Sequence, residues 1–431
     1  MSFKGRMGVA MTGGAGAVLV LVSGCSGGGG EKGSGELSST KAGAVTITPG
    51  NGTGKVKPDG VIEVKVSEGA LDAVTVQGKG ATITGKMSPD KKTWRSDRTL
   101  TPGTSYTVTA QARNDGKTSS ATSTFTTLKP AKTLSVLDVT PNLKGEEVGV
   151  GMPIMLRFNR PVADRAAVER ALKVTPDHPV EGAWRWIDSQ QVIYRTKTYW
   201  KAHQKVRFNA ALAGVNAGNG VYGVKDAEAT LNIGAAQITT GDISEHRMTV
   251  RRDGKKLRTI PFSAGNGQTR EFTTTSGVHL LMEKGSPVTM VSPGRKEGDP
   301  GYYKTVVNHA VRFSNSGEYT HSAPWSVGAQ GNSNVSHGCL NLSPSNAKWY
   351  YDIMQRGDVL KLTGTSRDVE WNNGWGFWQM SFEKWKKGSA LNGESAATGA
   401  TGAPDAGTAG GAPATDPAST PTTDPASTPA G

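Results

Sequence analysis

The stretch from Tyr319 to Asn346 holds residues whose types and spacing favour nucleophilic chemistry. It contains the run Ser336-His337-Gly338-Cys339-Leu340-Asn341, and His321 stands eighteen residues before the cysteine. A free thiol has a pKa of about 8.5 and is mostly protonated at neutral pH, but a nearby imidazole can accept its proton and leave a nucleophilic thiolate. Cys339 is therefore predicted to be a catalytic nucleophile that is paired with a histidine.

Two histidines compete for the role of base. His337 is two residues from Cys339, and on an extended segment both side chains would share a face. His321 is remote in sequence, so only the fold can bring it close. Gly338 gives the backbone freedom beside the cysteine, and consecutive N–H groups there would suit an oxyanion hole.

Two other interpretations stay open at the level of residues. His321, His337 and Cys339 would supply three zinc ligands, but a structural zinc site takes four and the usual paired spacing is missing. The other interpretation is an unreactive, buried cysteine beside two unrelated histidines. We predict no metal site and no cofactor.

The N-terminus bears on whether this thiol has a disulfide partner. Lys4 and Arg6 precede a run of apolar and small residues from Val9 to Val22, which suits a signal peptide and is too short to span a bilayer. The run Val22-Ser23-Gly24-Cys25 resembles a bacterial lipobox, so residues 1–25 are predicted to be a lipoprotein signal peptide with lipid on Cys25. An ordinary signal peptide with a chance cysteine is the alternative. The chain has only two cysteines, so Cys339 would be a lone thiol on the outer face of the cytoplasmic membrane.

Composition limits the partners. The chain has 431 residues and a formal net charge of +13, which favours anionic partners such as wall polymers. It has no zinc-finger spacing, no RNA-binding motif and no basic stripe interleaved with aromatics. We therefore expect no binding of nucleic acid. Attachment to the membrane is expected through the lipid on Cys25.

The chain is predicted to be mainly β, with two immunoglobulin-like β-sandwich modules followed by a β-rich third domain. Alternating apolar residues in short runs, such as Val61–Val66, predict the sandwiches, and the turn before Tyr106 resembles an immunoglobulin-like corner. The predicted boundaries are a flexible tether at 26–43, module 1 at 44–128, module 2 at 129–235, the third domain at 236–364, an aromatic segment at 365–387 and a disordered Pro/Ala/Thr-rich tail at 388–431.

Local signals add detail to the third domain and to the segment after it. Asp253-Gly254 between alternating runs predicts a tight hairpin. Ser343-Pro344 predicts the start of one short helix after the cysteine, and Gly357 its end. The dense aromatics of residues 365–387 are expected to pack back on the third domain, with stacking on carbohydrate as the alternative.

The motif residues resemble those of a known family. Fourteen residues separate His321 from Ser336, and the run that follows matches the L,D-transpeptidase (YkuD-type) pattern of His, a spacer, Ser/Thr-His-Gly-Cys, one residue and Asn. The resemblance extends through His321–Val327 and Ser343–Ala347. A lipoprotein signal, two immunoglobulin-like modules, a catalytic domain and an aromatic C-terminal piece also match the family layout, which covers roughly residues 44 to 387.

This resemblance implies a peptidoglycan acyltransferase acting on stem peptides. Cys339 would attack the carbonyl between diaminopimelate and D-Ala and form a thioester, which an amine of a neighbouring stem resolves to a 3→3 cross-link. The resemblance gives His321 the role of base, oriented by the main chain of Ser322, and gives His337 local support. The substrate contacts that it implies are Tyr303, Ser316, Gly317, Asn341 and Trp325. Carbapenem-type β-lactams are implied as covalent inhibitors.

One departure from the family and two rival functions are noted. Relatives of this layout often carry a further Tyr in the flap over the site, whereas Val288–Gly301 offers Met290 and prolines. An L,D-carboxypeptidase that uses the same site is the first rival. The second is a wall-binding lipoprotein without enzymatic activity.

Overall fold

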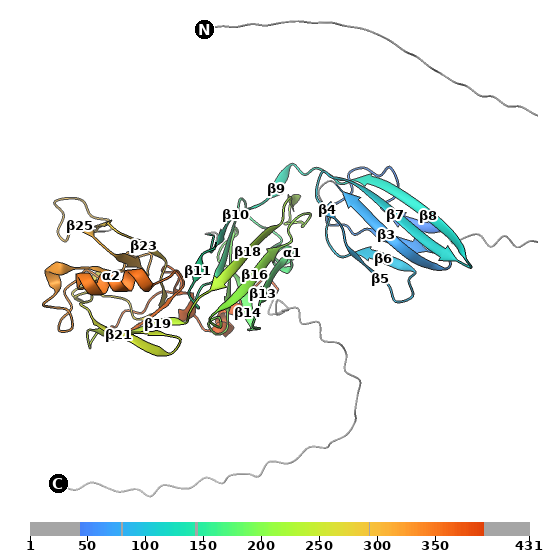
Figure 1. The fold of residues 1–431 in the computed structure, drawn as a ribbon. Helices are drawn as coiled ribbons and strands as arrows, with labels where there is room; N and C mark the ends of the chain where they lie inside the picture. The colour runs from blue at the N-terminus through green and yellow to red at the C-terminus, as the bar shows by residue number, and fades with distance from the viewer. Residues whose placement is uncertain (1–43, 79–80, 143–144, 293, 392–431) are drawn as a thin grey trace, which may run out of the picture.

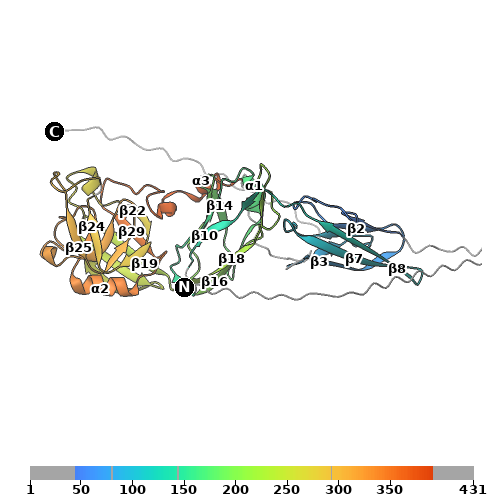
Figure 2. The same ribbon diagram turned by 90° about the horizontal axis from the view of Figure 1, so that it is seen from above.

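The computed structural model describes residues 44–78, 81–142, 145–292 and 294–391. In this range the chain forms three β-rich units that follow one another along the molecule (Figures 1 and 2). The predicted mainly β class is confirmed. The predicted lipid-bearing Cys25, the tether and residues 392–431 of the tail lie outside the described residues. Within the described ranges, no helix is both long and apolar enough to cross a bilayer.

The first unit is a sandwich of eight strands. These are β1 (Val45–Thr48), β2 (Glu63–Val66), β3 (Ala70–Gly78), β4 (Ala81–Thr82), β5 (Gly85–Met87), β6 (Thr93–Ser96), β7 (Ser105–Asn114) and β8 (Lys117–Thr126). They form two sheets with the orders β1-β2-β6-β5 and β4-β3-β7-β8. Buried Tyr106 ties down the predicted corner, because its hydroxyl accepts the Thr101 N–H at 2.8 Å.

The second unit is another sandwich with one short helix. Its elements are β9 (Lys132–Leu134), β10 (Val136–Thr140), β11 (Glu147–Val148), β12 (Ile154–Phe158), α1 (Arg165–Arg170), β13 (Leu172–Pro176), β14 (Gly182–Trp186), β15 (Gln191–Thr196), β16 (Gln204–Ala210), β17 (Val221–Gly223) and β18 (Ala227–Ile233). The two main sheets have the orders β10-β12-β15-β14 and β11-β18-β16-β13. Trp184, Trp186 and Trp200 fill the core between them, which is the burial that apolar aromatics favour.

The third unit carries the predicted nucleophile. Its elements are β19 (Gln237–Asp242), β20 (Arg247–Arg252), β21 (Lys255–Pro261), η1 (Arg270–Phe272), β22 (Gly277–Leu280), β23 (Glu283–Gly285), β24 (Val288–Val291), β25 (Lys304–Val307), β26 (Ala310–Arg312), β27 (Tyr319–Ser322), η2 (Pro324–Ser326), β28 (Leu340–Leu342), α2 (Pro344–Ile353) and β29 (Val359–Thr363). One sheet has the order β21-β20-β19-β29-β22, and the other has the order β23-β26-β27-β28.

Local turn and cap chemistry places two of these elements where the sequence predicts them. The hairpin of β20 and β21 turns at Asp253-Gly254, and both residues have positive φ. Helix α2 begins after Ser343, whose hydroxyl accepts the Asn346 N–H, and it packs against β26 and β27. It ends at Ile353, before the predicted stop at Gly357.

The aromatic C-terminal segment packs on both neighbouring units. The Val369 N–H donates to the Ser276 carbonyl of the third unit at 2.8 Å and Gln379 accepts the Val278 N–H at 3.1 Å, so the expected packing on the third domain is one part of its contacts, and a second part lies on the second unit. Its elements are η3 (Gly376–Gln379) and α3 (Phe382–Lys386). Phe377, Met380, Phe382 and Trp385 form one buried cluster with Met155 and Ile193 of β12 and β15. The guanidinium of Arg195 lies over the rings of Trp378, Phe382 and Trp385 and explains this choice of surface, because aromatic faces attract a buried cation.

The first residues of the predicted disordered tail are also ordered, which corrects the boundary at 388. The Gly388 carbonyl accepts the Trp186 N–H at 3.0 Å. The buried carboxylate of Glu169 accepts the Ser389 hydroxyl and, at 2.8 Å, the Ala390 N–H. A buried carboxylate needs such donors, and Ser389 and Ala390 supply them.

Candidate active site

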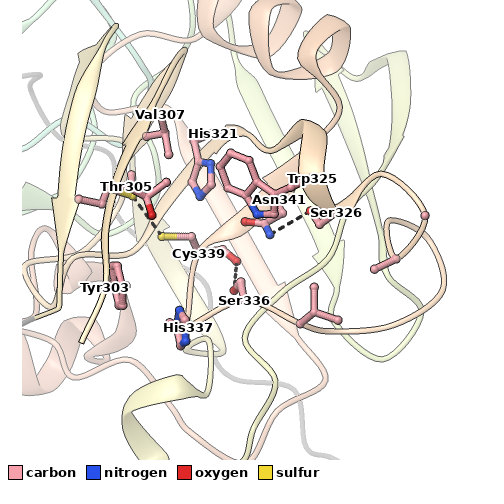
Figure 3. Close-up of a pocket in the computed structure, with 14 residues that line it drawn as sticks. Tyr303, Thr305, Val307, His321, Trp325, Ser326, Ser336, His337, Cys339 and Asn341 are labelled. Atoms are coloured by element: carbon pink, nitrogen blue, oxygen red, sulfur yellow. Dashed lines mark hydrogen bonds between the residues drawn. The ribbon is translucent and has the colours of Figure 1, made fainter. Parts of the chain in front are cut away.

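Two neighbouring strands bring the predicted catalytic residues together. β27 and β28 pair in parallel, with His321 opposite Asn341 and Thr320 opposite Leu340. Because side chains alternate along a strand, Cys339 and Asn341 share one face, and the register puts His321 on the same face. Figure 3 shows the side chains of His321, Cys339 and Asn341 directed into one cavity.

This cavity has a volume of about 440 Å³ and is lined by no carboxylate, Lys or Arg. The flap formed by β24 and β25 covers one side, and the loop around η2 covers another (Figure 3). The lining residues are Met290, Tyr303, Thr305, Val307, His321, Trp325, Ser326, Gly328, Ala329, Val335, Ser336, His337, Cys339 and Asn341. The Cys339 thiol and the His321 imidazole therefore line the same cavity, and none of the other lining side chains is an Asp, Glu, Lys or Arg that could compete for the proton.

The thiol of Cys339 is protonated at rest. Its sulfur contacts the Gly317 carbonyl oxygen at 3.7 Å and the Met290 sulfur at 4.0 Å. Burial raises the pKa of the Cys339 thiol to about 12, a hydrogen bond from the backbone of Tyr319 opposes this rise, and the Glu318 carboxylate adds to it. The cysteine therefore needs a base to become a nucleophile at neutral pH.

His321 has the geometry of such a base. It is buried, and its Nδ1 lies 3.0 Å from the Ser322 carbonyl oxygen, which only accepts, so Nδ1 carries the proton. Nε2 is then the ring nitrogen that can accept a proton. Burial lowers the pKa of His321 below its usual value, although the bond to Ser322 opposes this shift. The imidazole is therefore neutral and basic at neutral pH.

His337 is held in a different way. Its ring is stacked on Tyr303, with centroids 4.7 Å apart and planes inclined by 7°, and meets Phe272 edge-on at 4.6 Å. Unlike His321, it makes no hydrogen bond within the described residues that would fix its tautomer. Of the two histidines that the residues alone leave in competition, the geometry favours His321 as the base and gives His337 a packing role beneath the flap.

The turn before Cys339 is held by hydroxyl groups. The Ser336 hydroxyl donates to the Cys339 carbonyl at 2.7 Å and accepts the Gly338 N–H at 3.0 Å, and the Thr274 hydroxyl donates to the Gly338 carbonyl at 2.7 Å. Gly338 has a φ of +129°, which disfavours any residue with a side chain. The Gly338 N–H is thus already bonded, which argues against the predicted share of this group in an oxyanion hole.

Comparisons with known proteins agree with the motif. The model of the L,D-transpeptidase catalytic domain matches residues 237–363, and the model of the bacterial Ig domain matches residues 53–216. L,D-transpeptidase 2 of Mycobacterium tuberculosis is 36% identical over 350 residues, which are 80% of this chain and 85% of that protein. L,D-transpeptidase 5 of the same species is 35% identical over 355 residues, which are 80% and 77% of the two chains.

The chain belongs to the L,D-transpeptidase family. This confirms the family that the motif predicts. Among solved structures, the L,D-transpeptidase LdtMt1 in complex with imipenem is 37% identical and covers 53% of this chain and 99% of its own, with a TM-score of 0.46. Within the described residues of this L,D-transpeptidase, the His, Cys, Asp and Glu side chains form no group of three that could hold a metal ion.

The substrate contacts implied by the family fall into two groups. Tyr303, Trp325 and Asn341 line the cavity, and Asn341 is fixed by a bond from its side-chain nitrogen to the Ser326 hydroxyl at 3.1 Å. Ser316 and Gly317 are not among the lining residues, although the Gly317 carbonyl reaches the thiol. The roles of these five residues in substrate binding stay predictions.

Several residues at the site were assigned no role from the sequence. Met290, noted there only as part of the flap, comes to within 4.0 Å of the thiol. Ser326 and Ser336 fix neighbours through their hydroxyls. Glu318 is a buried carboxylate in a polar, Ser-rich stretch. Ser336 and Met290 stand in quoted motifs, but nothing in the spacing signals Glu318.

Proposed function

We propose that this L,D-transpeptidase forms 3→3 cross-links between peptidoglycan stem peptides. The observation that carries the proposal is the placement of Cys339 and His321 in one cavity whose lining has no charged side chain, with Nδ1 of the imidazole fixed by the Ser322 carbonyl. A neutral thiol beside a neutral imidazole suits attack on a peptide carbonyl, because the proton can move from sulfur to Nε2 as the new bond forms.

The first half of the reaction forms a thioester. The Cys339 sulfur attacks the carbonyl carbon that links diaminopimelate to D-Ala in the donor tetrapeptide, and its proton passes to His321. The C–N bond then breaks, and the D-Ala amine leaves with the proton that His321 held. A donor tetrapeptide is thereby converted to a tripeptide that is bound to the enzyme through sulfur.

The second half transfers the acyl group. The side-chain amine of diaminopimelate on a neighbouring stem attacks the thioester carbonyl, and His321 takes a proton from this amine. The C–S bond breaks, and the proton returns to the Cys339 sulfur. One amide bond replaces another, so the cycle needs no cofactor. The order of the two halves makes water a competitor for the thioester, and a hydrolytic outcome would make the chain an L,D-carboxypeptidase.

Product analysis is the test of this function. Purified enzyme and disaccharide-tetrapeptides should yield 3→3 dimers and free D-Ala, which mass spectrometry with fragmentation can identify. Accumulation of tripeptide monomers without dimers would indicate the carboxypeptidase instead. Absence of both products, together with a thiol at Cys339 that imipenem leaves unmodified, would favour the wall-binding lipoprotein. Imipenem is the probe because a complex of LdtMt1 with it has been solved.

We also propose that the chain is anchored by lipid on Cys25, so that the two sandwiches lift the catalytic unit from the outer face of the cytoplasmic membrane toward the wall. The support is the lipobox-like run that ends at Cys25 and the serial order of the three units (Figure 1).

The anchor gives a simple prediction. Wild-type chain should partition with the membrane fraction, and Cys25→Ala should release it or leave the unprocessed precursor, because the acylated residue is lost. Immunoblotting of separated fractions is the measurement. Ser26→Ala is the matched control and should stay with the membrane. Equal distribution of wild type and Cys25→Ala, with both proteins processed to the same size on the blot, would contradict the anchor without touching the proposed activity.

A further inference from the structure

The loop from Ser314 to Glu318 lies directly beside the nucleophile. It joins β26 to β27, the strand that carries His321. Its Gly317 has a φ of +91°, and the carbonyl of that residue contacts the Cys339 sulfur at 3.7 Å. A shift of this loop would therefore move the Gly317 carbonyl away from the thiol. It would also move the backbone of Ser316 and Gly317, along which a donor peptide would lie.

One side of the loop is fixed from within the catalytic unit. The buried carboxylate of Glu318 accepts the Thr275 N–H at 2.8 Å and the hydroxyl of Thr275 at 2.9 Å. It also accepts the Ser316 hydroxyl at 3.0 Å. Because a buried carboxylate needs several donors, these bonds hold the inner side of the loop firmly.

The other side is fixed by a residue from the C-terminal segment. Asn373 accepts the Ser316 N–H through Oδ1 at 2.9 Å and donates from Nδ2 to the Ser316 hydroxyl at 3.0 Å. The next residue, Gly374, is seated so closely that a side chain there would come within 3.2 Å of backbone atoms of Ser314 and Asn315. Asn373 also donates to Glu370 at 3.2 Å, so the turn that presents it is itself braced.

The segment that supplies Asn373 is not part of the catalytic-domain match, which ends at residue 363. It is held from both sides: the Val369 N–H donates to the Ser276 carbonyl of the catalytic unit at 2.8 Å. On the second unit, Arg195 donates to the Met380 carbonyl at 2.7 Å and Trp385 donates to the Ala183 carbonyl at 3.0 Å. A continuous set of contacts thus runs from the second sandwich through the C-terminal segment to the loop at the nucleophile.

We infer that Asn373 is a positioning residue for acylation: it holds Ser316 and Gly317 in the place where a donor peptide must meet the Cys339 thiol. The inference rests on the proposed function, which supplies the donor peptide. The N–H and the hydroxyl of Ser316 are both bonded, so the backbone carbonyl of Ser316 is the group that this residue would offer to the donor peptide. Without the Asn373 amide, the backbone of Ser316 and Gly317 can shift. Small errors of position at a reacting centre lower the rate of reaction strongly.

The test compares Asn373→Ala with Asn372→Ala, because Asn372 is the same residue type at the next position and is exposed. For each variant we would measure the second-order rate of Cys339 acylation by imipenem, the rate of Cys339 alkylation by iodoacetamide, and the thermal unfolding midpoint. We expect Asn373→Ala to lower acylation about tenfold, since misplacement by about 1 Å costs up to about 100-fold. Alkylation by the small reagent and the unfolding midpoint should stay near those of wild type, and Asn372→Ala should match wild type in all three.

Two results would overturn the inference. The first is acylation of Asn373→Ala at the wild-type rate. The second is an equal fall of acylation and alkylation together with a lowered unfolding midpoint, which would make Asn373 a purely structural residue. Neither result bears on the proposed function, because that function fails only if the wild-type enzyme makes no 3→3 dimers.

Discussion

Cys339→Ala is expected to abolish both acylation by imipenem and formation of 3→3 dimers, with a rate loss on the order of 10⁴-fold or more. The reason is that Cys339 supplies the only thiol among the residues that line the cavity, and the hydroxyls of Ser326 and Ser336 in the same wall already donate to backbone carbonyls. The measurement is intact-protein mass spectrometry for the adduct, together with quantification of dimers.

The control for this variant must show that the cavity survives. Cys339 is only partly buried, and replacing it with alanine removes a single sulfur atom that has two weak contacts, so the unfolding midpoint should change little. Dimer formation by correctly folded Cys339→Ala would contradict covalent catalysis at this residue. It would mean that another residue is the nucleophile or that no acyl-enzyme forms.

The parts of the site that follow from sequence are those specified by nearby residues. The Ser343 cap with Pro344 and the Asp253-Gly254 turn are local preferences of the backbone, and both elements form where predicted. The resemblance to the family motif implies His321 as the partner of Cys339, whereas the residues alone leave His337 in competition. The parallel register of β27 with β28 explains how seventeen intervening residues still leave both side chains on one face.

The parts that could not be predicted depend on contacts between remote residues. The bond from Arg195 to Met380 joins residues 185 positions apart, and no local pattern reveals that a buried arginine would draw the aromatic segment onto the second sandwich. The position of Glu318 is similar, since its partner Thr275 is 43 positions away. The break between β25 and β26 is a further example, because His309 takes a positive φ there, which its residue type does not signal.

The hydrogen bond of the Gly338 N–H is another feature that the sequence does not predict. The sequence correctly marks the residue as a glycine that the backbone requires, and its φ of +129° bears this out. The capture of its N–H by the Ser336 hydroxyl depends on a side-chain rotamer, and such local bonds compete with every other use of a backbone donor. A tetrahedral intermediate therefore needs at least one donor other than the Gly338 N–H.

His321→Ala is expected to lower the rate of Cys339 acylation at pH 7 by about 10²–10⁴-fold, the usual contribution of a general base. The pKa of the thiol is about 12, so only a very small fraction is thiolate at neutral pH when the imidazole is absent. His337→Ala is the matched control, because that ring lines the same cavity but is stacked on Tyr303. We expect it to lose much less activity.

The pH dependence separates a base from a merely structural histidine. In the wild type the reactive form needs neutral His321, whose pKa is lowered by burial, so acylation should hold as pH falls to about 6.5 and decline only below that value. In His321→Ala the rate should follow the thiolate, and should rise about tenfold per pH unit from pH 7 toward 10, while the wild type stays nearly flat.

Stopped-flow measurement of imipenem acylation across this pH range gives both profiles. A flat profile for His321→Ala would mean that the imidazole does not take the proton of the thiol, even if the variant is slow. A wild-type profile that rises in parallel with the variant would mean that free thiolate, and not the neutral pair, is the attacking species. Only a divergence of the two slopes assigns the proton transfer to Nε2 of His321, because a change in cavity shape alone alters the rate at every pH by the same factor.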